Sequence, residues 1–172
     1  DKDCHYPGLV AKMVSVGGNS RLWAIQENGD WARWAPDLDS WQVYSEKRKF
    51  IFADPATEEA CYYIDLEGNV HWRNIDQDED RYYPGIKAEI ISVGADGRLW
   101  AIQKNGRWAR WAPDLGKWQT FFEQREFIFA DPSSTSTCYY ADFDGSVHWR
   151  NIDLDEERTY PGIKALMVSV GG

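Results

Sequence analysis

The sequence predicts an all-β fold, a β-propeller built from four repeats of 38 or 39 residues. Three observations support this prediction. The chain contains a gapless tandem duplication, each copy contains a second and weaker period, and each resulting unit reads as aromatic strands separated by Gly-containing turns. A β-sandwich made from duplicated halves is the structural alternative.

The duplication has a period of 77 residues. RLWAIQENGDWARWAPDL at 21–38 returns as RLWAIQKNGRWARWAPDL at 98–115. The halves 6–82 and 83–159 align without a gap, and residues 160–172 form an extra copy of the first strand. A repeat of this kind is the signature of an array of similar structural units.

Each half contains a second period of 39 residues, because LWAIQENGDWARW at 22–34 aligns with CYYIDLEGNVHWR at 61–73. The units therefore follow an ABAB order, and we interpret residues 1–172 as a single repeat domain. Closely spaced Pro and Gly residues exclude long helices.

Four short strands fit into each unit. In the first unit they are expected at 9–16, 21–27, 30–35 and 41–45. Strands of this length separated by Gly-containing turns are typical of a propeller blade.

The register of the hairpins follows from their turns. Asn28-Gly29 is a strong two-residue turn signal, and it places Trp23 opposite Trp34. The corresponding turn of the even unit places Tyr63 opposite Trp72. Both faces of each sheet then carry large apolar side chains, which is expected of a sheet packed between two neighbours.

The two ends of the chain carry the same strand. MVSVGG occurs at 13–18 and at 167–172, although a closed ring of four units has a place for only one copy. One end lies outside the ring, or pairs with another chain, or the chain is a segment of a longer array. An unpaired edge strand favours association, so we expect a homo-oligomer, most simply a dimer. Cys4 is a disulfide candidate because its repeat equivalents are Arg.

The net charge of −9 argues against nucleic acid as a partner and against docking on an anionic membrane. Insertion into a membrane is not expected, because no long apolar stretch occurs. The polar N-terminal sequence DKDCHYPG has no signal-peptide core, which fits a cytosolic protein or an already processed one.

No catalytic motif is present, so we expect neither an enzyme nor a cofactor. His71 and His148 are repeat equivalents and read as packed strand residues. The acidic stretch 76–80 reads as a solvated loop rather than a calcium site, and no metal is expected. Cys61 and Cys138 are expected to be buried thiols.

Aromatic residues make up 15% of the chain, with ten Trp, and some of them recur beside Asp, Arg or Asn. Aromatic rings stack on the C–H face of a sugar, while planar polar groups take its hydroxyls. Inter-blade packing is the competing interpretation for each single Trp. The candidate carbohydrate-binding residues are Trp34, Asp37, Trp41, Trp72, Arg73, Asn74, Trp111, Asp114, Trp118, Trp149, Arg150 and Asn151.

The segment YPGIKAEIISVGADGRLWAIQKNGRWARWAPDLGKWQ at 83–119 resembles a tectonin repeat, and 6–42 resembles it equally. The even units match less well, because they carry Tyr and Cys where the pattern has Leu-Trp. The resemblance implies a tachylectin-like propeller lectin that is extracellular and binds glycans on cell or microbial surfaces. A structural or storage protein that assembles through the duplicated end strand is the second interpretation, and a hemopexin-like module that binds a protein or cofactor is the third.

Overall fold

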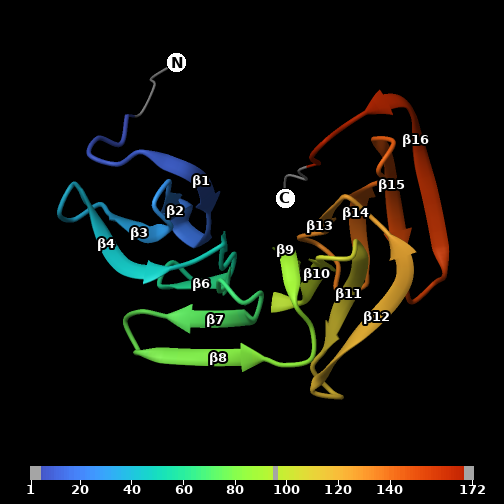
Figure 1. Ribbon diagram of the computed structural model, residues 1–172, viewed down its shortest axis with the longest axis horizontal. Coiled ribbons are helices and arrows are strands. Elements are labelled where there is room, and N and C mark those ends of the chain that lie inside the picture. Colours follow the sequence, from blue (N-terminus) through green and yellow to red (C-terminus); the bar gives the residue numbers. More distant parts are fainter. Residues whose placement is uncertain (1–4, 95–96, 169–172) are drawn as a thin grey trace.

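The computed structural model describes residues 5–94 and 97–168, and in these residues the fold is β apart from short 3-10 turns at η1 (Gly18–Ser20) and Gly97. Four antiparallel sheets of four strands each follow one another along the chain, which confirms the predicted all-β propeller architecture (Figure 1). We call these sheets blades 1 to 4. The described residues contain no helix that could cross a lipid bilayer.

Each blade is a simple meander in which neighbouring strands in sequence are also neighbours in the sheet. Blade 1 contains β1 (Ala11–Val16), β2 (Leu22–Gln26), β3 (Asp30–Ala35) and β4 (Ser40–Lys47). Blade 2 contains β5 (Phe50–Ala53), β6 (Ala60–Ile64), β7 (Val70–Asn74) and β8 (Glu79–Tyr83). Blade 3 contains β9 (Ala88–Val93), β10 (Leu99–Gln103), β11 (Arg107–Ala112) and β12 (Lys117–Gln124). Blade 4 contains β13 (Phe127–Ala130), β14 (Thr137–Ala141), β15 (Ser146–Asn151) and β16 (Glu156–Lys164).

The predicted hairpin register is wrong by one residue. Trp23 lies opposite Arg33 rather than Trp34, and Tyr63 lies opposite His71 rather than Trp72. The cause is the turn, which is a three-residue loop: the Gly29 amide donates to the carbonyl of Gln26, and Gly29 has a φ of 87°. A type I turn followed by a left-handed residue is the usual three-residue hairpin connection.

The corrected register changes which side chains share a face, because a slip of one residue moves a strand's side chains to the other face. Trp23, Ile25 and Trp31 now lie on the same face of blade 1, and they pack against blade 2. The opposite face carries Ala24, Ala32 and Trp34.

Three apolar clusters hold the molecule together, one between each pair of consecutive blades. Trp23 and Trp31 stack between blades 1 and 2, and Trp100 and Trp108 repeat this arrangement between blades 3 and 4. For these Trp residues the packing interpretation is confirmed. The remaining cluster joins blades 2 and 3 and contains Trp72 and Trp118.

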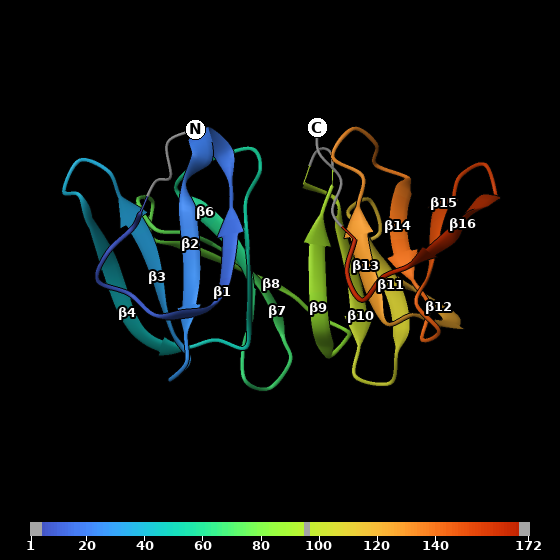
Figure 2. The same cartoon turned by 90° about the horizontal axis from the view of Figure 1, so that it is seen from above.

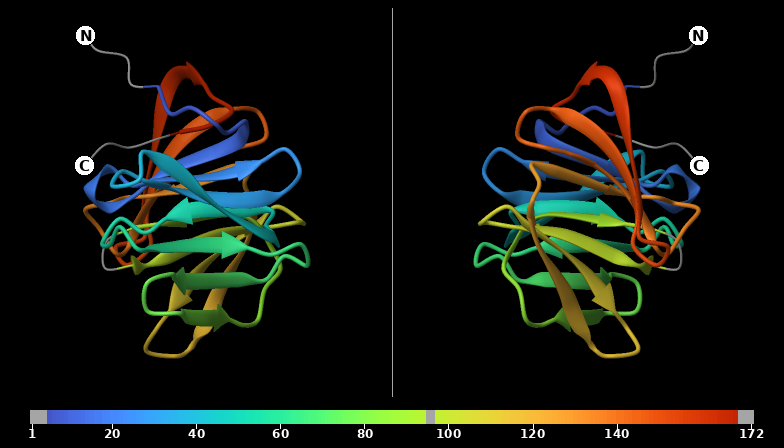
Figure 3. Two further views of the ribbon diagram at one scale, coloured as in Figure 1. Left: turned by 90° about the vertical axis from the view of Figure 1, so that its left-hand side faces the viewer. Right: turned by 90° about the vertical axis from the view of Figure 1, so that its right-hand side faces the viewer.

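The blades form an arc rather than a closed four-bladed ring (Figures 1 and 2). The innermost strands contact in the order β1, β5, β9 and β13, but within the described ranges β1 and β13 do not pack together as these neighbours do. The side views in Figure 3 show the sheets stacked with their strands crossing at an angle. The arc therefore has two end faces, one on blade 1 and one on blade 4.

The sequence Ser-Val-Gly stands at the end of the first strand in blades 1 and 3. In both places it packs against the blade that follows. The Ser92 hydroxyl accepts a hydrogen bond of 2.9 Å from the Ala130 amide, and Ser15 accepts one of the same length from Ala53. A Cβ atom on Gly94 would lie 2.9 Å from the carbonyl oxygen of Asp131, so only glycine fits there. The motif thus brings two inner strands into close backbone contact.

Replacing Ser92 with alanine should lower the free energy of unfolding by about 1–3 kcal/mol, because the buried Ala130 amide loses its acceptor. The matched change Ser15→Ala should have a smaller effect, since Ser15 is only partly buried at an end of the arc. Urea unfolding of the two variants checks this expectation. Equal losses of stability would contradict the role assigned to burial at this contact.

Candidate ligand-binding site

A cleft of about 290 Å³ lies between blades 2 and 3, next to Gly97 before β10 and Pro113 after β11, and the β13–β14 loop of blade 4 contributes Thr135. Its lining combines aromatic rings with two guanidinium groups. The lining residues are Tyr62, Arg81, Tyr83, Gly97, Arg98, Trp111, Pro113 and Thr135.

The aromatic wall is built by Tyr83, which bridges the two blades. Its ring lies perpendicular to that of Trp111 at a centroid distance of 5.1 Å, and 6.3 Å from the ring of Tyr62. The Tyr83 carbonyl accepts a hydrogen bond from the indole of Trp118. Burial raises the pKa of both Tyr62 and Tyr83, so their phenols remain hydroxyl donors at neutral pH.

Arg81 is held over the ring of Trp72, with its guanidinium carbon 4.4 Å from the ring centroid. The Trp72 indole donates a 2.8 Å hydrogen bond to the buried carboxylate of Asp54, which fixes the ring beneath Arg81. Glu79 forms an exposed ion pair with Arg81 at 3.2 Å. An exposed pair contributes little to stability and leaves the guanidinium free to exchange partners.

Arg98 enters the cleft from the other blade and donates to the carbonyl of Trp111 at 3.4 Å. Its repeat equivalent, Arg21, makes the same contact with Trp34 and also an ion pair of 3.0 Å with Glu58. Thr135 replaces Glu58 in the cleft, and the described residues give Arg98 no ion-pair partner. The cleft thus presents guanidinium and phenol donors next to an indole.

The structure brings three of the predicted site residues together at this interface. Trp111 lines the cleft, whereas Trp72 and Trp118 lie buried beneath it. Asp114 lies in the exposed β11–β12 turn, and Asp37 occupies the same place in blade 1. Neither carboxylate is among the residues that line the cleft.

The remaining candidates are engaged elsewhere. Arg73 and Arg150 pair with Asp78 and Asp155 in their own β-turns. The side chains of Asn74 and Asn151 accept hydrogen bonds from turn amides. Their local role is to shape the turns that connect β7 to β8 and β15 to β16.

Trp34 and Trp41 lie on the end face of blade 1, with ring centroids 5.4 Å apart. Trp149 lies on blade 4 under Arg158, whose guanidinium carbon is 4.9 Å from its ring. Among the described residues the two sides of the cleft therefore meet only between blades 2 and 3. The residues equivalent to each side lie on the end faces of blade 4 and blade 1.

Sequence reasoning missed Tyr62, Tyr83, Arg81 and Arg98. A signal was available in the repeat. An Arg precedes the Leu-Trp strand in both halves, as Arg21 and Arg98, and Tyr83 begins one of the Tyr-Pro-Gly sequences. The contact between them depends on which blade faces overlap, and the hairpin pattern does not provide that information.

The acidic stretch after β7 is neutralised by basic neighbours rather than assembled around a cation. Asp76 pairs with Arg33 across the blade boundary, and Asp80 accepts from Tyr63 and contacts His71. No group of three or more metal-ligating side chains occurs in the residues that the structure describes.

Cys61 and Cys138 are buried free thiols, as predicted. Burial raises the pKa of Cys61 to about 12, so the thiol stays protonated and unreactive. Cys4 lies outside the described residues.

Comparisons with known proteins show the fold. No protein-family model and no curated protein matches the chain. Among solved structures, the chain is similar to the crystal structure of RRP9 WD40 repeats, with a TM-score of 0.67 and 12% identity. The match covers 90% of this chain and 52% of that one, so the chain spans about half the length of the WD40 propeller. At this identity the similarity establishes a β-propeller fold and no more.

Proposed function

We propose that the protein is a non-enzymatic carbohydrate-binding protein, a lectin of the tectonin or tachylectin-like type, and that it binds glycans in the cleft between blades 2 and 3. The observation that supports this proposal is the combination of the Trp111 and Tyr83 rings with the Arg81 and Arg98 guanidiniums. An indole offers a stacking surface for a sugar ring, and a guanidinium offers paired donors for its oxygen atoms.

The side chains of the cleft favour a sugar that carries a carboxylate. Both Arg side chains are hydrogen-bond donors, and Arg–carboxylate pairs are frequently bidentate. Although the chain as a whole is acidic, none of the described residues that line the cleft is acidic, because Thr135 takes the place of Glu58. In this proposal the glycans are displayed on cell or microbial surfaces, and the protein binds them outside the cell.

The proposal is tested on an array of neutral and carboxylate-bearing glycans, followed by calorimetry with the strongest soluble binder. Arg98→Ala should weaken binding about 10- to 100-fold, as expected for loss of a charge-assisted contact of 1.5–3 kcal/mol. Arg21→Ala is the matched control, because the same side chain in blade 1 already pairs with Glu58. No binding to any glycan, or equal losses in the two variants, would contradict the proposal.

A further inference from the structure

A second depression lies at the edge of blade 3 opposite the cleft, where blade 3 meets blade 4. It has a volume of about 360 Å³ and includes Gln103 at the end of β10, whereas the cleft includes Gly97 before β10. Its lining combines the Phe143 ring with the side chains of Gln103, Asn105, Gln124 and several charged residues. We call it the Phe143 depression, and all of its lining residues lie between positions 89 and 143.

The Phe143 ring forms the aromatic wall of this depression. Phe143 is 63% exposed and lies between β14 and β15. Its Cζ atom would be 3.2 Å from a Cβ atom on Gly106, so the ring lies close over the β10–β11 turn. Gly106 has a φ of 80°, a conformation that suits glycine. The turn thus brings its backbone close to the ring, while most of the ring surface stays open to a ligand.

The equivalent turn in the first half of the chain, Asn28-Gly29, is closed by its neighbours. The Lys47 side chain covers Gly29, because its Cδ atom would be 3.4 Å from a Cβ atom on that glycine. The Lys47 ammonium pairs with Asp30 at 2.6 Å, and the Asn28 side-chain amide donates to the same carboxylate at 2.7 Å. Leu66 stands where the second half has an aromatic residue. The polar groups of this turn are therefore already engaged.

The turn of the second half lacks this closure, because Gln124 replaces Lys47 and Arg107 replaces Asp30. The Asn105 side-chain oxygen accepts a 3.0 Å hydrogen bond from the Arg107 amide, and the described residues offer no acceptor to its NH₂ group. The Gln124 NH₂ group donates to the Asn105 carbonyl at 2.9 Å, which leaves the Gln124 side-chain oxygen without a described donor. One amide donor and one amide acceptor thus remain open beside the ring.

The charges around the Phe143 depression balance each other. Lys104 and Arg125 are basic, whereas Glu89 and Glu126 are acidic. A ligand of either charge therefore meets both attraction and repulsion, unlike an acidic sugar in the cleft between blades 2 and 3. A hydroxyl group both donates and accepts hydrogen bonds, so it suits the open amide groups without requiring a charge.

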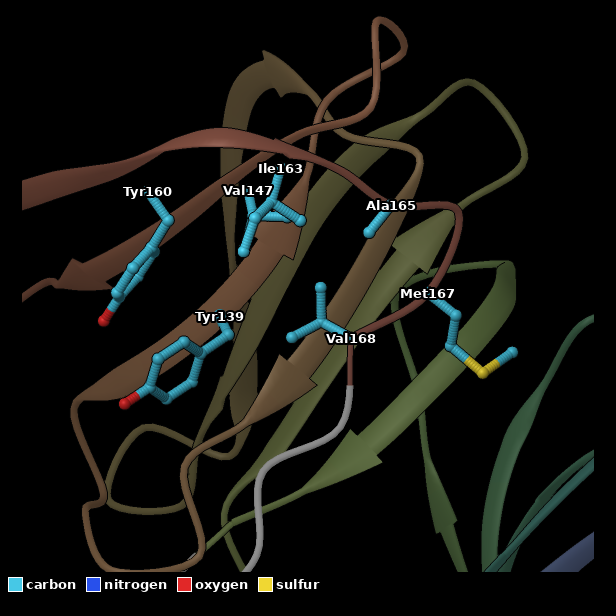
Figure 4. A pocket seen from close by; sticks show the side chains of 7 residues that line it. All are labelled: Tyr139, Val147, Tyr160, Ile163, Ala165, Met167 and Val168. Carbon is cyan, nitrogen blue, oxygen red and sulfur yellow. The ribbon is translucent and has the colours of Figure 1, made fainter.

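The apolar pocket on blade 4 has a different chemistry. It has a volume of about 420 Å³, and Figure 4 shows Tyr139, Val147 and Val168 among the side chains that line it. Its described lining contains no amide and no charged side chain. A ligand rich in hydroxyl groups finds few hydrogen-bond partners there, whereas the Phe143 depression offers both a ring and amides.

We propose that the Phe143 depression is a second ligand-binding site and that its ligand is a neutral sugar. The C–H face of the sugar stacks on Phe143, one hydroxyl accepts from the Asn105 amide, and another donates to the Gln124 oxygen. This site goes beyond the cleft between blades 2 and 3, whose guanidinium groups favour an acidic sugar. Blade 3 would then carry two sites of different chemistry at its opposite edges.

An NMR titration of the isotope-labelled full chain tests the proposal. The probes are the methyl glycosides of glucose, galactose, mannose and N-acetylglucosamine, with methyl glucuronide as the charged counterpart. At least one neutral glycoside should shift the signals of the Asn105 side-chain amide and the Gly106 backbone amide. We expect saturation with a dissociation constant on the order of 1 mM, because a monosaccharide has few atoms from which to gain binding free energy. The signals of Asn28 and Gly29 are the internal control.

Phe143→Leu gives the site the residue that the first half carries at the equivalent position. It should weaken binding of the neutral glycoside about 3- to 10-fold, because the stacking surface is lost. Phe122→Leu is the matched control, since Phe122 is 77% exposed on β12 and is not among the lining residues. Both aromatic residues are largely exposed, so both variants should keep the wild-type melting temperature, which a thermal melt verifies.

Three results would overturn the proposal. The first is the absence of a saturable shift with any neutral glycoside up to about 50 mM, well above the expected dissociation constant. The second is equal shifts at Asn28 and Asn105, and the third is wild-type affinity in Phe143→Leu. Tighter binding of methyl glucuronide than of the neutral glycosides would contradict the ligand class. Because the signals come from the turn at the far end of β10 from the cleft, the outcome is separate from that of the proposed function.

Discussion

Replacing Arg48 with alanine should lower the free energy of unfolding by about 3–5 kcal/mol, an effect as large as removing a core aromatic residue. The Arg48 side chain is 2% exposed and lies between the rings of Trp31 and Tyr63, with its guanidinium carbon 3.6 Å from each centroid. Desolvated cation–π contacts are the strongest of their kind. The truncation also leaves a void in the interface between blades 1 and 2.

The duplication supplies an internal control. Arg125, the repeat equivalent of Arg48, lies 4.1 Å from the single ring of Tyr140 and pairs with Asp142 at 3.3 Å. Arg125→Ala should therefore destabilise the protein less, by about 1–2 kcal/mol. Urea unfolding of the two variants measures the difference, and Arg48→Met separates loss of charge from loss of volume.

Thiol reactivity gives a local readout of the same change. The Arg48 guanidinium donates to the sulfur of Cys61 at 3.4 Å, while burial keeps the pKa of that thiol at about 12. Opening of the blade 1–2 interface in Arg48→Ala should expose Cys61 to a thiol reagent while Cys138 stays protected. An Arg48→Ala protein with unchanged stability and a protected Cys61 would contradict the role assigned to this stack.

The arrangement of strands could be read from the sequence, whereas the register could not. The duplication and the Gly-containing turns correctly indicated four blades of four strands. The dipeptide Asn28-Gly29 suits both a two-residue and a three-residue loop, and the difference of one residue moved Trp34 away from Trp23. The structure identifies the three-residue loop by the Gly29 amide, which donates to the Gln26 carbonyl, and by the left-handed φ of Gly29.

The candidate site was predicted in part because its halves belong to different blades. Trp111 was found through its aromatic neighbours in sequence, whereas Arg81 reaches the same cleft from a strand of the preceding blade. Asn74 was proposed as a sugar ligand on residue type, but its side chain accepts the amide of Gln77 in a turn. Turn formation and ligand binding draw on the same short polar side chains, so composition cannot separate them.

The preference of the cleft for an acidic sugar should be lost in Thr135→Glu. Glu58 pairs with Arg21 at 3.0 Å in the first half of the chain, and Thr135 takes the equivalent place beside Arg98. A carboxylate at position 135 would pair with Arg98 and repel an acidic sugar, so Thr135→Glu should weaken binding of a carboxylate-bearing glycan about 10- to 100-fold in calorimetry. Equal affinities of the wild-type protein and Thr135→Glu for that glycan would contradict the role assigned to Arg98.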